Sequence, residues 1–302
     1  MPAPGAGEAI VRHRAIGLNF IDTYHRSGLY PVALPFVPGT EASGVVQAVG
    51  EGVTELAVGD RVAYATGPLG SYSEARAIPA RFLVRLPDEI EERAAAAMML
   101  KGLTAQYLVR QCVPLKAGDT ILLHAAAGGT GLFISQWAKH LGATVIGTAG
   151  SDDKARLARD HGCDHVIVYT REDFVARARE LTNGRGVDVV YDGVGKDTFL
   201  RSIECLRVRG TLVSFGQASG AIPPFDVRAL SKGSLYLTRP SLMTYAAERA
   251  DLVRMVGELF DVVRSGAVRV EVAQTAPLGD AARAHRDLES RKTTGSTVLL
   301  PA

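Results

Sequence analysis

Cysteine and an excess of either charge are both scarce in this sequence. It has only three cysteines, at positions 112, 163 and 205, and its 34 basic and 32 acidic side chains leave a net charge of +2. Cysteines this far apart form no metal-binding spacing and cannot all pair with one another. A net charge this small gives no electrostatic reason to expect a nucleic acid or a membrane surface as a partner. We therefore predict a protein of the reducing cytoplasm with no specific nucleic-acid partner.

Long hydrophobic runs and a secretory signal are lacking too. No apolar stretch is long enough to span a bilayer, and Met1–Gly5 shows no basic region followed by an apolar core. We therefore expect neither a membrane partner nor a secretory leader. The 302 residues, 47% of them hydrophobic, provide an ample core and suggest about two domains.

The glycine-rich stretch His124–Gly131 is the most informative part of the sequence. It follows the apolar run Thr120–Leu123 and opens an apolar-periodic segment, Leu132–Ala138, which predicts a strand, a tight turn and a helix. The N–H groups and the dipole of such a helix N-terminus favour negative charge. Gly128 lets the main chain approach a pyrophosphate, and Gly131 lets the helix pack against the strand. These features predict a dinucleotide cofactor.

The glycine pattern alone is weak evidence, because Ala126 stands where the usual fingerprint has its first glycine. An ordinary connection in an α/β protein would look the same. The segments that follow favour a Rossmann domain over about Gly102–Pro240, since strands that alternate with helices imply parallel strands with crossover helices. The predicted strands are 143–149, 166–169, 187–192 and 210–216, and the predicted helices are 153–160 and 172–181.

The end of the second of these strands indicates which nicotinamide cofactor binds. Enzymes that use NAD place Asp or Glu there to hold the ribose 2′-hydroxyl, whereas this chain has Gly150 and Ser151, followed by Lys154. A hydroxyl group and a positive charge suit a 2′-phosphate, so we predict NADPH. In the alternative interpretation, Lys154 is a solvated helix residue and Asp152 or Asp153 reaches the ribose.

The segments on either side predict a second, β-rich domain. Short apolar runs at 44–50 and 60–64 lie between glycine and proline turns, which indicates short strands. A helix at 91–100 is expected to bridge the domains. The C-terminal elements complete the β-rich domain in this interpretation, with the active site in a cleft beside the cofactor domain. These elements are helices at 250–265 and 279–289 and strands at 269–273 and 296–300.

Several long motifs are shared with a known enzyme family. They are 15–24, 26–31, 38–44, 101–105, the alanine-rich glycine turn, 213–216 and 239–242. On these motifs, from about Gly7 to Leu300, the chain resembles the zinc-free quinone oxidoreductases, the zeta-crystallin-like branch of the medium-chain dehydrogenase/reductase superfamily. The resemblance implies an α/β fold. A GroES-like β-rich catalytic domain (1–101 plus 241–302) would carry an inserted Rossmann domain (102–240), a doubly wound parallel sheet that binds NADPH.

The resemblance also implies a reaction without a metal. Zinc-dependent relatives have a catalytic histidine where this chain has Thr40, and their cysteine ligands, including a closely spaced four-cysteine lobe, are missing here. Zinc catalysis needs three protein ligands around an open position. None of the seven histidines is joined to cysteines at a metal-binding spacing. We therefore predict no metal site.

Matching positions imply the substrate contacts. A quinone oxygen gains negative charge as the ring is reduced, and without zinc, hydrogen-bond donors must stabilise that charge. The side chains of Asn19, Tyr24 and Tyr30 are the expected donors, with Asn19 and Tyr24 near the nicotinamide and Gln217 as a lesser candidate. Transfer of hydride and transfer of single electrons both stay open.

The resemblance also implies the cofactor contacts, some of which have a structural alternative. Asn19 is alternatively a helix cap, Tyr169 a core residue of a strand, and Arg291 a solvated charge at a helix end. The implied contacts are Thr104, Ala127, Gly128, Gly129 and Thr130 at the diphosphate, Ser151, Lys154, Tyr169 and Arg291 at the 2′-phosphate, and Asn19, Val194, Phe215, Gly216 and Gln217 toward the nicotinamide.

Two other functions stay open. Related zinc-free enzymes reduce the C=C bond of 2-alkenals, enones or acyl thioesters. Other relatives are structural lens proteins of the crystallin type or bind AU-rich RNA, and arginines 171, 177, 179 and 185 would be the basic residues for RNA. Such a charge run is usually a solvated helix face.

The resemblance also implies one expectation about a sheet edge of the cofactor domain and one about the start of the chain. Strand 234–238 is expected to be the edge of the cofactor domain through which two copies pair as a homodimer, with an isologous interface. Relatives carry a strand pair ahead of the Pro2–Gly5 motif. The chain start is therefore expected to be misassigned or truncated, or the catalytic domain to lack one sheet edge.

Overall fold

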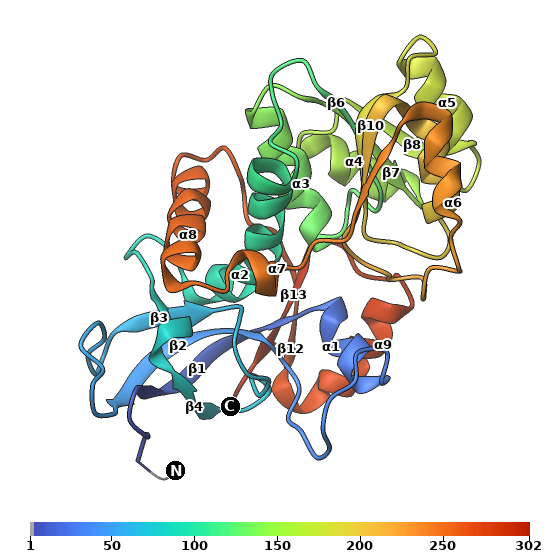
Figure 1. The fold of residues 1–302 in the computed structure, drawn as a ribbon. Coiled ribbons are helices and arrows are strands. Elements are labelled where there is room, and N and C mark those ends of the chain that lie inside the picture. The colour runs from blue at the N-terminus through green and yellow to red at the C-terminus, as the bar shows by residue number, and fades with distance from the viewer. Residues whose placement is uncertain (1–2) are drawn as a thin grey trace. The chain divides into compact units, whose positions relative to one another are not determined.

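The computed structural model describes residues 3–302, in which the chain leaves one unit, builds a second and returns (Figure 1). Unit 1 comprises Met1–Leu103, Tyr245–Arg264 and Val270–Ala302, and unit 2 comprises Thr104–Thr244 and Ser265–Arg269. The expectation about the chain start concerns Met1 and Pro2, which lie outside the described residues.

Unit 2 is built on a six-stranded sheet with the order β11-β10-β9-β6-β7-β8, in which every pair of neighbours is parallel. The first strand along the chain, β6, lies inside the sheet. The chain moves outward from it to β8, then crosses back to β9 and continues to β11, which is the strand order of dinucleotide-binding folds. The predicted doubly wound sheet is confirmed. The strands are β6 (Thr120–Leu123), β7 (Thr144–Ala149), β8 (His165–Val168), β9 (Val187–Asp192), β10 (Leu206–Ser214) and β11 (Tyr236–Thr238).

Helices connect these strands and pack against the sheet. They begin at polar caps where the sequence supplies them: the Ser151 side chain caps α4, and the Asp173 side chain accepts hydrogen bonds from two N–H groups of α5. Leu122, Ile146 and Val190 are fully or almost fully buried at the centre of the apolar core. The helices are α3 (Gly129–His140), α4 (Asp152–Asp160), α5 (Phe174–Leu181) and α6 (Phe199–Ser202), with a π turn at Leu108–Cys112 and 3-10 turns at Ile203–Cys205 and Val227–Gly233.

Unit 1 has a seven-stranded sheet with the order β12-β13-β1-β2-β3-β5, and β4 also pairs with β1. All neighbours are antiparallel except β12 and β13. Ile16, Val62 and Tyr64 are completely buried in the core of this unit. The strands are β1 (Glu8–Leu18), β2 (Glu41–Val49), β3 (Arg61–Tyr64), β4 (Ala75–Pro79), β5 (Val84–Arg85), β12 (Val272–Pro277) and β13 (Ser296–Leu300).

Helix α2 crosses the boundary between the units, since it begins in unit 1 and ends in unit 2. It is longer than the predicted helix 91–100. Gly102 does not end it, because a Cβ at that position would lie 2.6 Å from a methyl carbon of Leu259. Glycine there allows α2 to pack closely against α8. The helices are α1 (Phe20–Arg26), α2 (Glu92–Tyr107), α7 (Leu242–Tyr245), α8 (Arg249–Arg264) and α9 (Ala281–Glu289), with 3-10 turns at Ala80–Phe82 and Leu278–Asp280.

One strand was not predicted from the sequence, and another is displaced from its predicted position. Strand β1 has no clear period of two, because its register with β2 shifts between Ile10 and Val11 and again between His13 and Ala15. The predicted strand 269–273 is displaced: β12 begins at Val272, and Arg269 belongs to unit 2, where its N–H donates to the Gln136 side chain at 2.9 Å. No helix within residues 3–302 is both long and apolar enough for a membrane span.

Candidate functional site

The turn from β6 to α3 has space for only a hydrogen atom at Gly131. A Cβ there would lie 2.8 Å from the carbonyl oxygen of Ala126 and closer still to that of Ala125. Glycine therefore allows the helix to begin directly against the strand. At Gly128, the N-cap, an added Cβ would lie 3.2 Å from the Ala125 oxygen, which is a less severe contact than those at Gly131.

The N-terminus of α3 offers main-chain donors. The first helical hydrogen bond runs from the Leu132 N–H to the Gly128 carbonyl at 2.9 Å. The N–H groups of Gly129, Thr130 and Gly131 precede it, and such groups carry the positive end of the helix dipole. The first turn of α3 has no acidic residue. This helix end therefore fits the predicted diphosphate site, to which the turn also contributes Ala127.

The two acidic residues that follow β7 both have arginine partners. Asp152 accepts hydrogen bonds from the guanidinium of Arg171 at 2.9 and 2.6 Å, which lower the pKa of Asp152. Asp153 forms an ion pair with Arg156. Each carboxylate is therefore compensated by a guanidinium group, and the two ion pairs add no net charge at this strand end.

Ser151, Lys154 and Tyr169 lie together at the carboxyl end of β7. The Ser151 hydroxyl accepts a hydrogen bond from the Lys154 backbone N–H at 3.4 Å. The Tyr169 hydroxyl reaches the same place, because a Cβ on Gly150 would lie 2.7 Å from it. Tyr169 is 44% exposed, so the alternative that it is a core residue is wrong. The residue types at this strand end fit a 2′-phosphate rather than a 2′-hydroxyl.

Asp192, at the end of β9, shapes the next loop, and no sequence signal points to it. Its buried carboxylate accepts hydrogen bonds from the N–H groups of Val194 and Gly195 at 2.8 and 3.0 Å, and from the Thr198 hydroxyl at 2.9 Å. These bonds hold Val194 in place. Because Asp192 is the last residue of the mostly apolar run Val187–Asp192, the sequence shows it only as a strand residue and hides its role.

The loops after β9 and β10 are pressed together. A Cβ on Gly216 would lie 2.6 Å from the Gly193 carbonyl oxygen, and one on Gly193 would lie 2.9 Å from the Phe215 ring. The structure therefore brings Val194, Phe215, Gly216 and Gln217 together at the carboxyl edge of the parallel sheet. Cofactors of doubly wound folds bind at this edge, next to the point where the strand order reverses.

Asn19, Tyr24 and Tyr30 belong to unit 1 and gather around α1. Asn19 is the N-cap residue of α1, as in the structural alternative, but its side-chain amide donates to Glu41 at 2.7 Å. The rings of Tyr24 and Tyr30 meet edge to face, with centroids 5.2 Å apart, and the Tyr30 N–H donates to the Tyr24 carbonyl at 3.0 Å. Two aromatic rings beside an amide suit a planar, polar-edged ligand.

Glu41 and Lys101 form a buried ion pair behind Asn19. Glu41 is completely buried and accepts hydrogen bonds from the Asn19 amide, from the Leu100 N–H at 2.7 Å and from the Lys101 ammonium at 3.5 Å. The Lys101 ammonium also donates to the Leu18 carbonyl at 3.4 Å. Both charged residues lie in shared motifs (38–44 and 101–105). Lys101 directly follows the apolar run 94–100, which was the available signal for it, whereas no sequence signal marks Glu41.

Two predicted cofactor contacts, Thr104 and Arg291, lie elsewhere. Thr104 is buried in α2, in unit 2. Arg291 is exposed in unit 1, in the turn after α9, where its φ is +60°. Thr40 is buried, and its hydroxyl has no hydrogen-bond partner among residues 3–302. Over residues 3–302, no three His, Cys, Asp or Glu side chains are grouped so that they could hold a metal ion.

Known proteins resemble both units. Residues 5–88 match the alcohol dehydrogenase GroES-like domain, and residues 129–258 match the family model described as zinc-binding dehydrogenase. The quinone oxidoreductase of Pseudomonas aeruginosa is 56% identical over 300 residues, which are 99% of this chain and 92% of that protein. A 2-haloacrylate reductase of Burkholderia sp. is 47% identical over 307 residues, again 99% of this chain and 92% of the other.

A solved structure is also very similar. The Escherichia coli quinone oxidoreductase complexed with NADPH has a TM-score of 0.98 and 50% sequence identity, and the match covers 100% of this chain and 94% of that one. The predicted combination of a GroES-like domain with a Rossmann-type sheet is thus confirmed.

Proposed function

Because this chain belongs to the quinone oxidoreductase family of the medium-chain dehydrogenase/reductase superfamily, we propose that it is an NADPH:quinone oxidoreductase that works without a metal. The observation that carries the choice of cofactor is the end of β7. Ser151, Lys154 and Tyr169 gather there, and both nearby acids are paired with arginines. The domains of the proposed enzyme correspond to the two units, with unit 1 catalytic and unit 2 binding the cofactor.

Unit 2 provides the cofactor contacts in this proposal. The N-terminus of α3 binds the diphosphate through main-chain N–H groups, with Thr104 in support. The hydroxyls of Ser151 and Tyr169 and the charge of Lys154 bind the 2′-phosphate. Val194, Phe215, Gly216 and Gln217 flank the nicotinamide ribose. When bound, the cofactor supplies a hydride, or single electrons, from its nicotinamide ring.

Unit 1 provides the substrate contacts. The edge-to-face rings of Tyr24 and Tyr30 give a flat apolar wall for a quinone. Their hydroxyl groups and the Asn19 amide donate hydrogen bonds to the quinone oxygen as it gains negative charge. Donors that are fixed in advance stabilise such charge more than water does, and the buried Glu41 and Lys101 fix Asn19.

The proposal is tested by oxidation of NADPH in the presence of 1,4-benzoquinone, 9,10-phenanthrenequinone and 2-hexenal. We expect quinone-dependent oxidation and a kcat/KM for a quinone above that for the enal, with NADPH preferred to NADH. Absence of turnover with every quinone, under conditions where NADPH binding is measured directly, would refute the assignment.

A C=C reductase is the second candidate, and the 2-haloacrylate reductase from Burkholderia sp. favours it. An enal or a haloacrylate places a carbonyl oxygen over the same three donors while the hydride goes to carbon. A higher kcat/KM for 2-chloroacrylate or 2-hexenal than for any quinone would make this the function.

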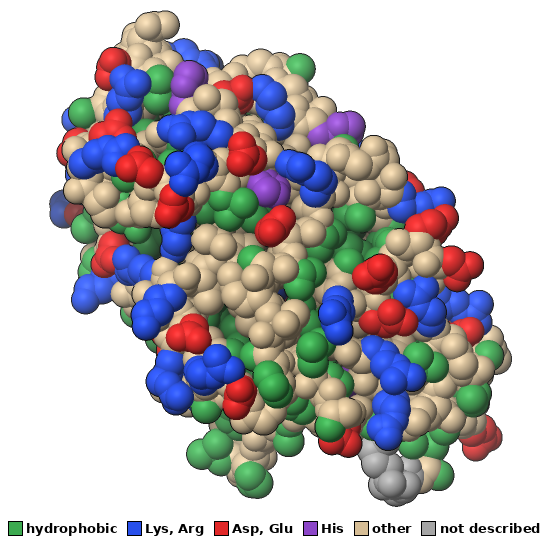
Figure 2. All heavy atoms as spheres, turned by 180° about the vertical axis from the view of Figure 1, so that it is seen from behind, with side chains coloured by type: hydrophobic (Ala, Val, Ile, Leu, Met, Phe, Trp, Pro, Cys, Tyr) green, Lys and Arg blue, Asp and Glu red, His purple; other side chains and the backbone are tan. Residues whose placement is uncertain are grey.

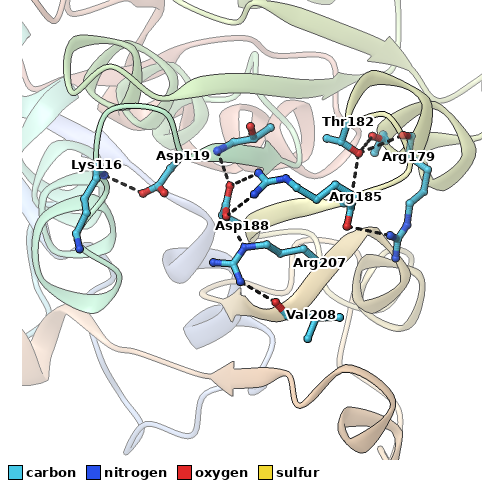
Figure 3. Close-up of polar contacts among 11 residues, drawn as sticks. Lys116, Asp119, Arg179, Thr182, Arg185, Asp188, Arg207 and Val208 are labelled. Carbon is cyan, nitrogen blue, oxygen red and sulfur yellow. Dashed lines mark hydrogen bonds and ion pairs between the residues drawn. The ribbon is translucent and has the colours of Figure 1, made fainter.

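The contacts of the arginines do not favour an RNA-binding function. Arg171 and Arg177 pair with Asp152 and Glu180. Figure 3 shows Arg185 directed at Asp188 and Arg179 bonded to main-chain oxygens. Basic and acidic side chains also alternate over the face in Figure 2. Phosphate binding draws on clustered, uncompensated positive charge, which these pairs reduce.

We also propose that two copies pair through β11. This strand lies at one end of the sheet order of unit 2, with β10 as its neighbour, and Tyr236 on it is 60% exposed. An exposed strand edge accepts a second copy by isologous pairing. A 32 kDa particle in light scattering at micromolar concentration would refute the dimer. A cytoplasmic location is proposed as well, because no disulfide joins the three cysteines, all of which lie within residues 3–302, and this suits a reducing compartment.

A further inference from the structure

Asp22 is a completely buried carboxyl group in α1, three residues after Asn19. Its Oδ2 accepts two hydrogen bonds, from the Asn19 backbone N–H at 2.9 Å and from the Tyr72 hydroxyl at 3.1 Å. Its Oδ1 is buried and has no partner among residues 3–302. A charged oxygen in that position is costly, since no donor of the described residues compensates it.

A chain of hydrogen bonds fixes the direction in which Tyr72 donates. The Arg26 guanidinium lies 3.0 Å from His285 Nδ1, and His285 Nε2 lies 2.9 Å from the Tyr72 hydroxyl. Arginine only donates, so Nδ1 accepts and Nε2 of the neutral ring carries the hydrogen. Burial, and then the charge of Arg26, lower the pKa of His285 and keep the ring neutral. The Tyr72 hydroxyl therefore receives from His285 and donates to Asp22.

The charges around Asp22 come from β2 and α2. Glu41 of β2 and Lys101 of α2 form a buried ion pair with N···O 3.5 Å, and both act electrostatically on Asp22. Two buried carboxyl groups thus share one ammonium group. Glu41 receives three hydrogen-bond donors spread over both oxygens, whereas Asp22 receives both of its donors on one oxygen. A single proton on Asp22 Oδ1 leaves the cluster without net charge, which a low-dielectric interior favours.

We infer that Asp22 is a positioning residue that must be a neutral carboxylic acid for the Asn19 donor site to accept the negative charge of the reduced substrate. The inference rests on the proposed function. An ionised Asp22 would place an uncompensated negative charge behind Asn19, in addition to the balanced Glu41–Lys101 pair, and the developing oxyanion would be repelled. The neutral acid leaves only the Glu41–Lys101 pair, whose charges cancel. Asp22 exchanges its proton with solvent at equilibrium and gives none to the substrate.

Burial raises the pKa of Asp22 to about 7, against the lowering effect of its hydrogen bonds from Asn19 and Tyr72. The acid is therefore neutral below about pH 7 and ionises above it. Activity is expected to be full on the acid side and to fall on the alkaline side. Between pH 6 and pH 8.5 the neutral fraction of such a group falls roughly 30-fold.

The test uses the full-length protein and single-turnover NADPH oxidation by a quinone between pH 6 and pH 8.5. For the wild type we expect a loss approaching roughly 30-fold. Asp22→Asn keeps the shape and is neutral at every pH, so it should keep the low-pH rate within about threefold and lose the alkaline decline. Asp226→Asn, at an exposed carboxylate of unit 2 that pairs with Arg228, is the matched control and should keep the wild-type profile.

Tyr72→Phe sharpens the test. It removes a donor that favours ionised Asp22, so the decline should move to higher pH. Infrared difference spectra give a readout that needs no turnover: a protonated carboxyl band should disappear from the wild type as the pH rises, and Asp22→Asn should lack it.

Several outcomes overturn the inference. One is a rate for Asp22→Asn more than tenfold below the wild type at pH 6 with NADPH binding intact, since Asp22 would then supply the proton itself. Another is an unchanged pH profile in Asp22→Asn, and a third is the absence of a titrating band. If no quinone is reduced at any pH but the band titrates, the proposed function fails while the assignment of a neutral Asp22 stands.

Discussion

The two units present their functional groups in opposite ways. In unit 2 the groups are main-chain N–H donors and partly exposed side chains, each within a few residues of a strand end, as with Ser151 after β7. In unit 1 they are buried and connected over long sequence distances: Asn19 with Glu41, and Tyr72 with His285 on α9. This difference suggests that unit 2 determines cofactor affinity through local motifs, whereas unit 1 determines turnover through a network. Substitutions should therefore separate the two effects.

The largest effect is expected from a substitution in the glycine turn between β6 and α3, which is the local motif of unit 2. Gly131→Val would force α3 away from the carbonyls of Ala125 and Ala126, and the helix N-terminus would leave the diphosphate position. We expect NADPH affinity to fall by at least about 100-fold, or roughly 3 kcal/mol, as measured by fluorescence titration.

The control for that variant is Gly257→Ala, an exposed position in α8 where an added Cβ meets no atom within 4 Å. It should bind NADPH normally and gain up to about 1 kcal/mol in unfolding free energy. If Gly131→Val, folded by circular dichroism, bound NADPH within threefold of the wild type, the close contact would not be what positions the diphosphate.

The second effect breaks the network of unit 1. Glu41→Gln leaves Lys101 buried without its anion and weakens the alignment of Asn19. We expect kcat with a quinone to fall on the order of 30-fold and the unfolding free energy in urea to fall by about 3 kcal/mol. The NADPH dissociation constant should change less than threefold. Glu91→Gln, at an exposed acid just before α2, is the control. If Glu41→Gln lost as much NADPH affinity as kcat, the proposed division of roles, with cofactor affinity set by unit 2 and turnover by unit 1, would be wrong.

The next smaller effect concerns the preference for NADPH over NADH. Lys154→Ala removes the charge that we assign to the 2′-phosphate, so NADPH affinity should fall about tenfold while NADH affinity stays the same. Lys139→Ala, at an exposed lysine of the same unit that pairs with Asp164, should change neither. Equal losses for both cofactors would remove Lys154 from the phosphate site.

The fold was predictable where burial gives an unbroken signal. Strands of the parallel sheet are covered on both faces, so the mostly apolar run Val187–Asp192 is buried along its whole length, and its bounds were predicted correctly. Strand β1 was missed, because register shifts interrupt its alternation. Helix α2 was predicted too short, since Gly102 resembles a stop signal until Leu259 is seen to pack on it.

The residues of the candidate site likewise divide into those that could be predicted from the sequence and those that could not. The glycine turn and the end of β7 were predictable because the chemistry is contained in neighbouring residues. Glu41, Asp22 and Asp192 were not, because a buried acid has meaning only through its partners, and the Tyr72 and His285 side chains that fix Asp22 are 213 residues apart. The roles assigned to Asn19, Tyr24 and Tyr30 stay predictions.

The smallest effect sharpens the comparison inside unit 1. Tyr24→Phe and Tyr30→Phe keep the edge-to-face rings, with centroids 5.2 Å apart, and remove one hydroxyl each. A neutral hydrogen bond contributes about 1 kcal/mol, so each variant should lose about fivefold in kcat/KM for a quinone, with NADPH affinity unchanged. If only one variant loses activity, its hydroxyl is the donor and the other ring serves as an apolar wall. If neither does, the Asn19 amide carries the charge stabilisation alone, and the buried pair of Glu41 and Lys101 behind it becomes the main determinant of turnover.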